Sequence, residues 1–185
     1  MEYVNHGRFL GNARANYFYL HLYAIMHSIY FQVCWVMNLD EVQNRLGLHF
    51  TDEKLLLEAL THSSCLNEPK MGLHRSNENL AWLGDAVIDW VVSEALYDPD
   101  LSKACLTDLR KKYVGKKFLA GFARDLGLDF TMFLPDGQEK EGGRKNQKNL
   151  HTVFEAVVGA IFRDKGFDIA NRFVLEKTRA RVLYM

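Results

Sequence analysis

The sequence has few cysteines and no excess of charge of either sign. Its cysteines, Cys34, Cys65 and Cys105, are scattered along 185 residues, which excludes a disulfide framework and a paired spacing for zinc. That usage is consistent with a reducing compartment. The 23 basic residues balance the 23 acidic ones, so any affinity for nucleic acid must come from local patches and not from overall charge.

Strand patterns, internal repeats and low-complexity tracts are also missing. Amphipathic or apolar helical patterns follow one another instead, and the length suits one domain with a substantial core. The sequence therefore predicts an all-α fold with two loops, over residues 67–75 and 135–148, the second of them mobile. Helices are expected over residues 39–47, 52–60, 77–96, 103–113, 116–126, 149–165 and 168–181, with Thr51 and Ser102 as capping residues.

Charged residues are absent from residues 17–37, and acidic residues from 4–39. The stretch 17–37 is long enough to cross a bilayer, but its histidine, serine and glutamine residues make it a poor hydrocarbon segment. An organelle presequence, a segment packed on the domain and a working start at Met37 are alternatives. We therefore divide the chain into an extension of uncertain nature, 1–38, and a domain, 39–185. We expect an intracellular protein that is not membrane-bound, in a mitochondrion or plastid, the cytoplasm or the nucleus.

Two helical patterns, residues 77–96 and 149–165, are apolar on nearly every side, which predicts that both run through the interior. Each carries one acid near its middle, Asp85 in the first and Glu155 in the second. A carboxylate is rarely buried without a partner. The pair is therefore typical of a divalent cation held between two helices, or of acids neutralised by arginine or backbone donors. Gly84, a weak helix former, indicates a close approach beside Asp85.

These residues resemble the ribonuclease III family. NENLAWLGDA, residues 77–86, is similar to the signature helix of that family, and FEAVVGAIFRDKG, residues 154–166, to its second active-site helix. ALTHSS at 59–64 and the segment 106–128 also match, in the same order. The resemblance covers about residues 39–181 and implies a helical nuclease domain.

In the active family, four acids hold the divalent cations, Mg²⁺ or Mn²⁺, that cleave double-stranded RNA. The resemblance makes Asp85, Glu155 and Glu78 the candidate catalytic residues. Asp85 and Glu155 match metal ligands, whereas Glu78 matches a leading glutamate that is not a ligand. The other two ligand positions fall on Ala81 and Thr152. Because two-metal hydrolysis depends on carboxylates around the cations, we expect metal occupancy to fall sharply.

Neighbouring residues are weak replacements for the two lost acids. Asp89 lies one turn beyond Asp85. Thr152 offers a hydroxyl to a metal-bound water, and His151 beside it suits softer metals than magnesium.

Two groups of basic residues and one aromatic residue are candidates for contacts with partners. A basic helical face is either a solvated surface or a grip on the phosphates of duplex RNA, and the resemblance favours RNA. The resemblance also implies a homodimer anchored by Trp82, although an isolated tryptophan in such a helix is more often core. The RNA candidates are Arg110, Lys111, Lys112, Lys116 and Lys117 in one group, and Arg144, Lys145 and Lys148 in the other.

Two functions are compatible with this pattern. The first is a noncatalytic module that binds structured or double-stranded RNA, in RNA processing or as a ribonucleoprotein component, with no cofactor. The second is an active endonuclease that depends on Mg²⁺ or Mn²⁺. A heterodimer partner that supplies a complete site is a third arrangement. Since the chain ends directly after its last predicted helix, we expect the nuclease-type domain without a double-stranded-RNA-binding domain.

Overall fold

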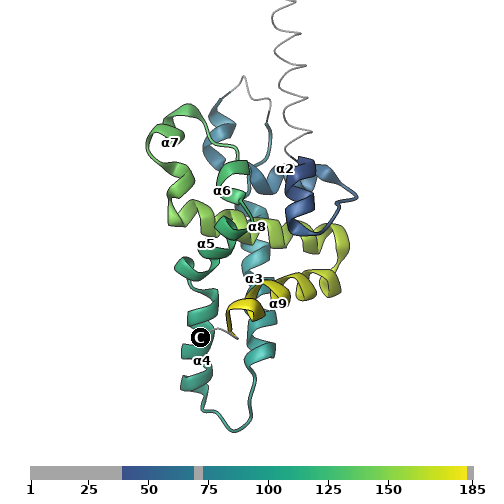
Figure 1. The fold of residues 1–185 in the computed structure, drawn as a ribbon, viewed down its shortest axis with the longest axis vertical. Coiled ribbons are helices and arrows are strands. Elements are labelled where there is room, and N and C mark those ends of the chain that lie inside the picture. The colour runs from purple at the N-terminus through teal and green to yellow at the C-terminus, as the bar shows by residue number, and fades with distance from the viewer. Residues whose placement is uncertain (1–38, 69–72, 183–185) are drawn as a thin grey trace, which may run out of the picture. The chain divides into compact units, whose positions relative to one another are not determined.

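The computed structural model describes residues 39–68 and 73–182 (Figure 1), so the expectations for residues 1–38 lie outside the described part of the chain. Residues 39–46 are helical, and no strand occurs in the described segments, where the only β-pairing is a parallel bridge between Thr61 and Phe133. The all-α prediction is confirmed. The further elements are α2 (Glu53–Leu60), η1 (Ser63–Asn67), α3 (Glu78–Leu96), α4 (Lys103–Val114), α5 (Lys116–Asp125), α6 (Leu128–Thr131), α7 (Asp136–Lys140), η3 (Gly143–Lys145), α8 (Gln147–Lys165) and α9 (Phe167–Val182).

The segment expected as a loop, residues 135–148, is instead organised into α7, η3 and the first turn of α8. Arg144 holds it in place, because its Nη1 donates to the carbonyl oxygens of Asp129, Phe130 and Met132 at 2.9–3.1 Å. The short helix α6 was likewise not predicted. Elements of three to five residues are too short to show a helical period, so their stability depends on such tertiary contacts.

Helix α8 forms the centre of the core and runs across α3 in Figure 1. It packs against α2, α3, α5, α6, α9 and η3. Nine consecutive residues from Val153 to Ile161 are buried, and Phe154 is fully inaccessible. The prediction of an interior helix is therefore confirmed for α8.

The crossing of α3 and α8 is close because two glycines lie at it. A Cβ added to Gly84 would lie 1.8 Å from the carbonyl oxygen of Glu155, and one added to Gly159 would lie 2.1 Å from that of Leu80. No side chain fits at either distance. The close approach expected at Gly84 is thus the backbone of α8 itself.

Helix α3 differs from its prediction, because it buries only one face. Leu80, Gly84 and Ile88 are among the residues on that face, whereas Asp85 is exposed and the Trp82 side chain is 77% exposed. The interior position expected for Asp85 was therefore wrong. Apolar content could not predict the exposed face of α3, because that face itself carries aromatic residues. Helix α4, which runs beside the second half of α3, contributes no buried residue.

The end of α8 is tied to the start of α2 by Asp164. Its carboxylate accepts hydrogen bonds from the backbone N–H groups of Thr51 and Asp52 at 2.8 and 2.9 Å, and the Lys165 ammonium lies 3.1 Å away. Burial raises the pKa of Asp164, but these donors and Lys165 outweigh it, so the pKa lies below its ordinary value.

The predicted cap of α2 needs a correction as well. The cap is Asp52, whose side chain accepts from the N–H of Lys54, and not Thr51, whose own N–H is bound by Asp164. Ser102 caps α4 as predicted and accepts from the N–H of Cys105. Within the described residues, no helix has both the length and the hydropathy to cross a membrane.

Candidate functional site

The candidate site lies where α3 crosses α8, because the four positions matched to metal ligands lie around that crossing. Asp85 follows Gly84, which packs on the backbone of Glu155. Glu155 is only 7% exposed, so the two retained acids differ sharply in their access to water. At the other two positions Ala81 is a buried methyl group and Thr152 is half-buried.

The buried carboxylate of Glu155 is paired with His151. The histidine lies one turn earlier in α8, and its Nδ1 is 3.2 Å from Oε2 of Glu155. Both side chains are largely shielded from water. From the sequence, His151 was predicted only as a weak metal ligand. The spacing of four residues was the available signal for this pair.

The donors at the crossing do not fit a pair of divalent cations. Among the described residues there is no group of three or more histidine, cysteine, aspartate or glutamate side chains placed to hold a metal ion. Mg²⁺ needs hard oxygen ligands in octahedral geometry, and two-metal sites share several carboxylates. Ala81 supplies no donor, Thr152 only a hydroxyl, and Glu155 is engaged with His151.

Glu78 and His62 lie at the start of α3, in a second polar group. Glu78 is exposed in the first turn of the helix. His62 caps η1, since its Nδ1 accepts from the N–H of Ser64 at 3.2 Å. Burial lowers the pKa of His62, against opposing contributions from Asn149 and Glu78. These contacts give His62 a structural role at the start of η1.

The eight candidate RNA-binding residues fall into two groups at opposite ends of α5. Lys111 and Lys112 in the last turn of α4 lead to Lys116 and Lys117 at the start of α5, and all four are exposed. The end of α5 meets η3, where Arg124 Nη2 donates to the carbonyl of Lys145. Helix α5, which has 10 residues and is therefore about 15 Å long, separates the two groups.

The basic residues are not equally available to a ligand. The Arg144 guanidinium is engaged with three carbonyl oxygens and with Glu139, and Arg110 donates to Ser93 Oγ at 3.2 Å. Lys111 lies 3.3 Å from Asp108, but both side chains are exposed, so the pair is weak. Lys145 and Lys148 are exposed. Contact with RNA stays a prediction for the whole set.

An exposed aromatic row runs along α3 and past its end. The side chains of Trp82, Trp90 and Tyr97 are 77%, 53% and 71% exposed. Trp90 also packs edge-on against Phe167, with ring centroids 4.8 Å apart. The role of Trp82 as a dimer anchor stays a prediction, but in the described part of the chain Trp82 is a surface residue and not core.

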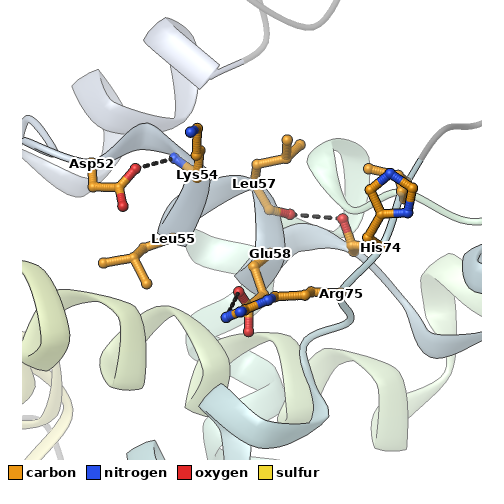
Figure 2. A pocket seen from close by; sticks show the side chains of 9 residues that line it. Asp52, Lys54, Leu55, Leu57, Glu58, His74 and Arg75 are labelled. Carbon is orange, nitrogen blue, oxygen red and sulfur yellow. Dashed lines mark hydrogen bonds and ion pairs between the residues drawn. The ribbon is translucent and has the colours of Figure 1, made fainter.

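An open pocket that the sequence did not predict lies between α2 and residues 73–75 (Figure 2). Arg75 extends across it toward Glu58, with Nη1 and Oε2 3.7 Å apart. The lining is mixed in charge, with the basic residues Lys54 and Arg75, the acidic residues Asp52 and Glu58, and His74. This mixture of charges does not specify a class of ligand.

Comparison with known proteins gives one consistent result. The family model described as Ribonuclease-III-like matches residues 52–181. Ribonuclease 3 of Geobacillus kaustophilus is 44% identical over 141 residues, which are 75% of this chain and 57% of that protein. Ribonuclease 3 of Bacillus cereus strain G9842 is 41% identical over 136 residues, 72% of this chain and 56% of that protein. The chain thus spans little more than half the length of these relatives.

Solved structures agree with the sequence matches. The nuclease domain of ribonuclease III from Campylobacter jejuni superposes with a TM-score of 0.70 at 32% identity, over 76% of this chain and 95% of that one. That structure is described as showing flexibility in a region involved in dimer formation. A second structure of the same domain gives a TM-score of 0.69 at 31% identity, over 77% of this chain and 94% of that one.

Proposed function

Because the chain belongs to the ribonuclease III-like family, we propose that it acts on structured or double-stranded RNA as a binding or assembly module, in RNA processing or in a ribonucleoprotein. Residues 39–185 form the working domain in this proposal, and residues 1–38 are an extension to it. The observation that carries the proposal is the donor set at the α3–α8 crossing. A methyl group and a hydroxyl stand at two ligand positions, and His151 is paired with the buried Glu155.

Binding would rest on the exposed lysines at the two ends of α5. Duplex RNA is held mainly through phosphates and 2′-hydroxyls, and lysine ammonium groups supply the matching charge. In this proposal one duplex lies along α5, which is about 15 Å long, and meets both groups. Lys116 and Lys117 are the best candidates in the first group, since both are exposed and begin the helix between the two groups.

A second candidate function is a compact, metal-dependent endonuclease. Asp85, Glu155 and Glu78 are all retained, and the relatives at 44% and 41% identity are ribonucleases. If Mg²⁺ or Mn²⁺ were bound, Asp85 and Glu155 would hold it, and the cation would activate water and stabilise the leaving oxygen. A partner subunit with a complete ligand set would give the same activity in a heterodimer.

Association through α3 is also part of the proposal. The aromatic row of Trp82, Trp90 and Tyr97 offers the kind of exposed apolar surface that marks protein contacts. We expect a homodimer with Trp82 as its anchor. Sedimentation of the full chain and of Trp82→Ala would measure this directly. An unchanged monomer–dimer equilibrium in the variant would contradict the role of Trp82.

The decisive experiment incubates the full chain with labelled duplex RNA in chelator, Mg²⁺ or Mn²⁺, beside Glu155→Gln. The proposal expects binding in all three conditions, no cleavage, and no loss of binding in the variant. Cleavage that needs the cation and disappears in Glu155→Gln would establish the endonuclease instead.

The binding surface is tested with Lys116→Ala/Lys117→Ala, with the exposed Lys54→Ala as control. Each lost phosphate contact should reduce the slope of log affinity against log salt by about 1. Equal affinity and equal salt dependence in the double variant and the control would show that this face of the domain does not bind RNA.

A further inference from the structure

Glu155 is the one acid within the buried stretch of α8, and its charge needs a partner inside the fold. The residues on both sides of it along the helix are inaccessible to water. An ionised carboxylate in such surroundings destabilises the fold strongly if it is left without a partner. Within the described residues, the ion-pair contact of Glu155 is made by His151, at 3.2 Å.

The charge at the crossing is small enough for one side chain to compensate it. Ala81 and Thr152 add none, and Asp85 is solvated on the exposed face of α3. The shielded site therefore holds a single carboxylate. A divalent cation would bring more charge than this carboxylate balances and would find too few oxygen ligands. One imidazole N–H supplies the partner that the carboxylate lacks, whether or not the ring carries a charge.

We propose that His151 takes the place of a cation at Glu155, so that the α3–α8 crossing is completed by the chain itself and is independent of metal. The pair comes from one helix, four residues apart, and therefore forms together with α8. This inference rests on the noncatalytic version of the site and not on RNA binding. His151 is in this sense a positioning residue. It holds the side chain of Glu155, and the backbone of Glu155 is the part of α8 that packs on Gly84.

The first test measures Mn²⁺ binding by the full chain from the loss of the free Mn²⁺ signal in electron paramagnetic resonance, and thermal unfolding in chelator, Mg²⁺ or Mn²⁺ at millimolar concentration. We expect no bound Mn²⁺ and the same melting temperature in all three. Bound Mn²⁺ that is lost in Glu155→Gln, or a melting temperature raised by either cation, would overturn the inference.

The second test is a double-mutant cycle between His151→Ala and Glu155→Gln. Removing the imidazole leaves a buried carboxylate alone, so His151→Ala should lower the melting temperature by about 4 °C or more. The double variant should lose clearly less than the sum of the two single losses. Losses that simply add would show that the two side chains do not depend on each other.

Matched controls come from exposed positions of the same residue types. His49→Ala and Glu94→Gln change an exposed histidine and an exposed acid, and neither should alter the melting temperature or its dependence on Mn²⁺. If His151→Ala does not fold, His151→Leu fills the space of the imidazole without an N–H donor and serves the same cycle.

Failure of this inference is separable from failure of the proposed function. One outcome is that RNA fails to bind in every condition while His151 and Glu155 are coupled in the double-mutant cycle and the melting temperature does not depend on Mn²⁺. That result would reject the proposed function and keep the role of His151.

Discussion

Helices α3 and α8 look alike in the sequence and differ in the structure. Both have 19 residues, both are largely apolar, and each carries an acid near its middle. Helix α8 is surrounded by other elements, and Glu155 is buried with it. Helix α3 covers α8 with one face and presents Trp82, Asp85 and Trp90 on the other. Apolar content therefore does not distinguish a core helix from one with a surface for partners.

The contrast between the buried helix α8 and the partly exposed helix α3 is tested most strongly by truncating an aromatic residue in α8. Phe154 is fully buried, between the rings of Phe122 and Phe173 at 5.7 and 6.4 Å. Phe154→Ala should reduce the free energy of unfolding by about 3–5 kcal/mol, because a large cavity remains. Urea denaturation measures the loss. A value below about 1 kcal/mol would mean that α8 is not the centre of the core.

The close crossing of the two helices is tested by Gly84→Ala. On helix propensity alone, this change should stabilise α3 by about 1 kcal/mol. The added Cβ would overlap the carbonyl of Glu155, so we expect instead a loss of about 3 kcal/mol in the free energy of unfolding. Gly137→Ala is the control, because its Cβ would meet nothing within 4 Å. Stabilisation by Gly84→Ala would contradict the observed crossing.

The tie between the end of α8 and the start of α2 is tested by Asp164→Asn. The amide cannot replace the charge that Thr51, Asp52 and Lys165 stabilise, so the variant should lose about 1–3 kcal/mol of unfolding free energy at neutral pH. Urea titrations at several pH values measure the difference.

The stability difference between the wild type and Asp164→Asn should also depend on pH. Because folding lowers the pKa of Asp164, its contribution is complete above the unfolded pKa of about 3.9 and is lost as the pH falls through that value toward the folded pKa. The difference between wild type and variant should therefore shrink in acid. A difference that grows below pH 4 would contradict this sign.

The smallest effect on the folded subunit is expected for Trp82→Ala in α3. With 77% of the side chain exposed, the unfolding free energy of the isolated subunit should change by no more than about 0.5 kcal/mol. Dilute samples keep subunit association out of the measurement. A loss as large as that of Phe154→Ala would remove the contrast between the two helices.

Much of the fold followed from local patterns. Seven helices, the cap at Ser102 and the interior position of α8 could be read from periodicity, capping residues and glycine stops. The short elements α6, α7 and η3 could not, because each is stabilised by contacts from elsewhere, such as the hydrogen bonds from Arg144 to three carbonyl oxygens. The exposure of Asp85 was missed because the aromatic stripe beside it imitates a buried face.

The sequence by itself determined which donors the site contains, because Ala81 and Thr152 cannot supply carboxylates in any fold. It also determined that Glu155 lies in an apolar helix. Only the tertiary structure decided which acid is buried, since that depends on what packs around each helix. It also decided that the contact between His151 and Glu155 is shielded from water, because the spacing of four residues brings the two side chains together in any helix, whereas their burial depends on the elements packed around α8.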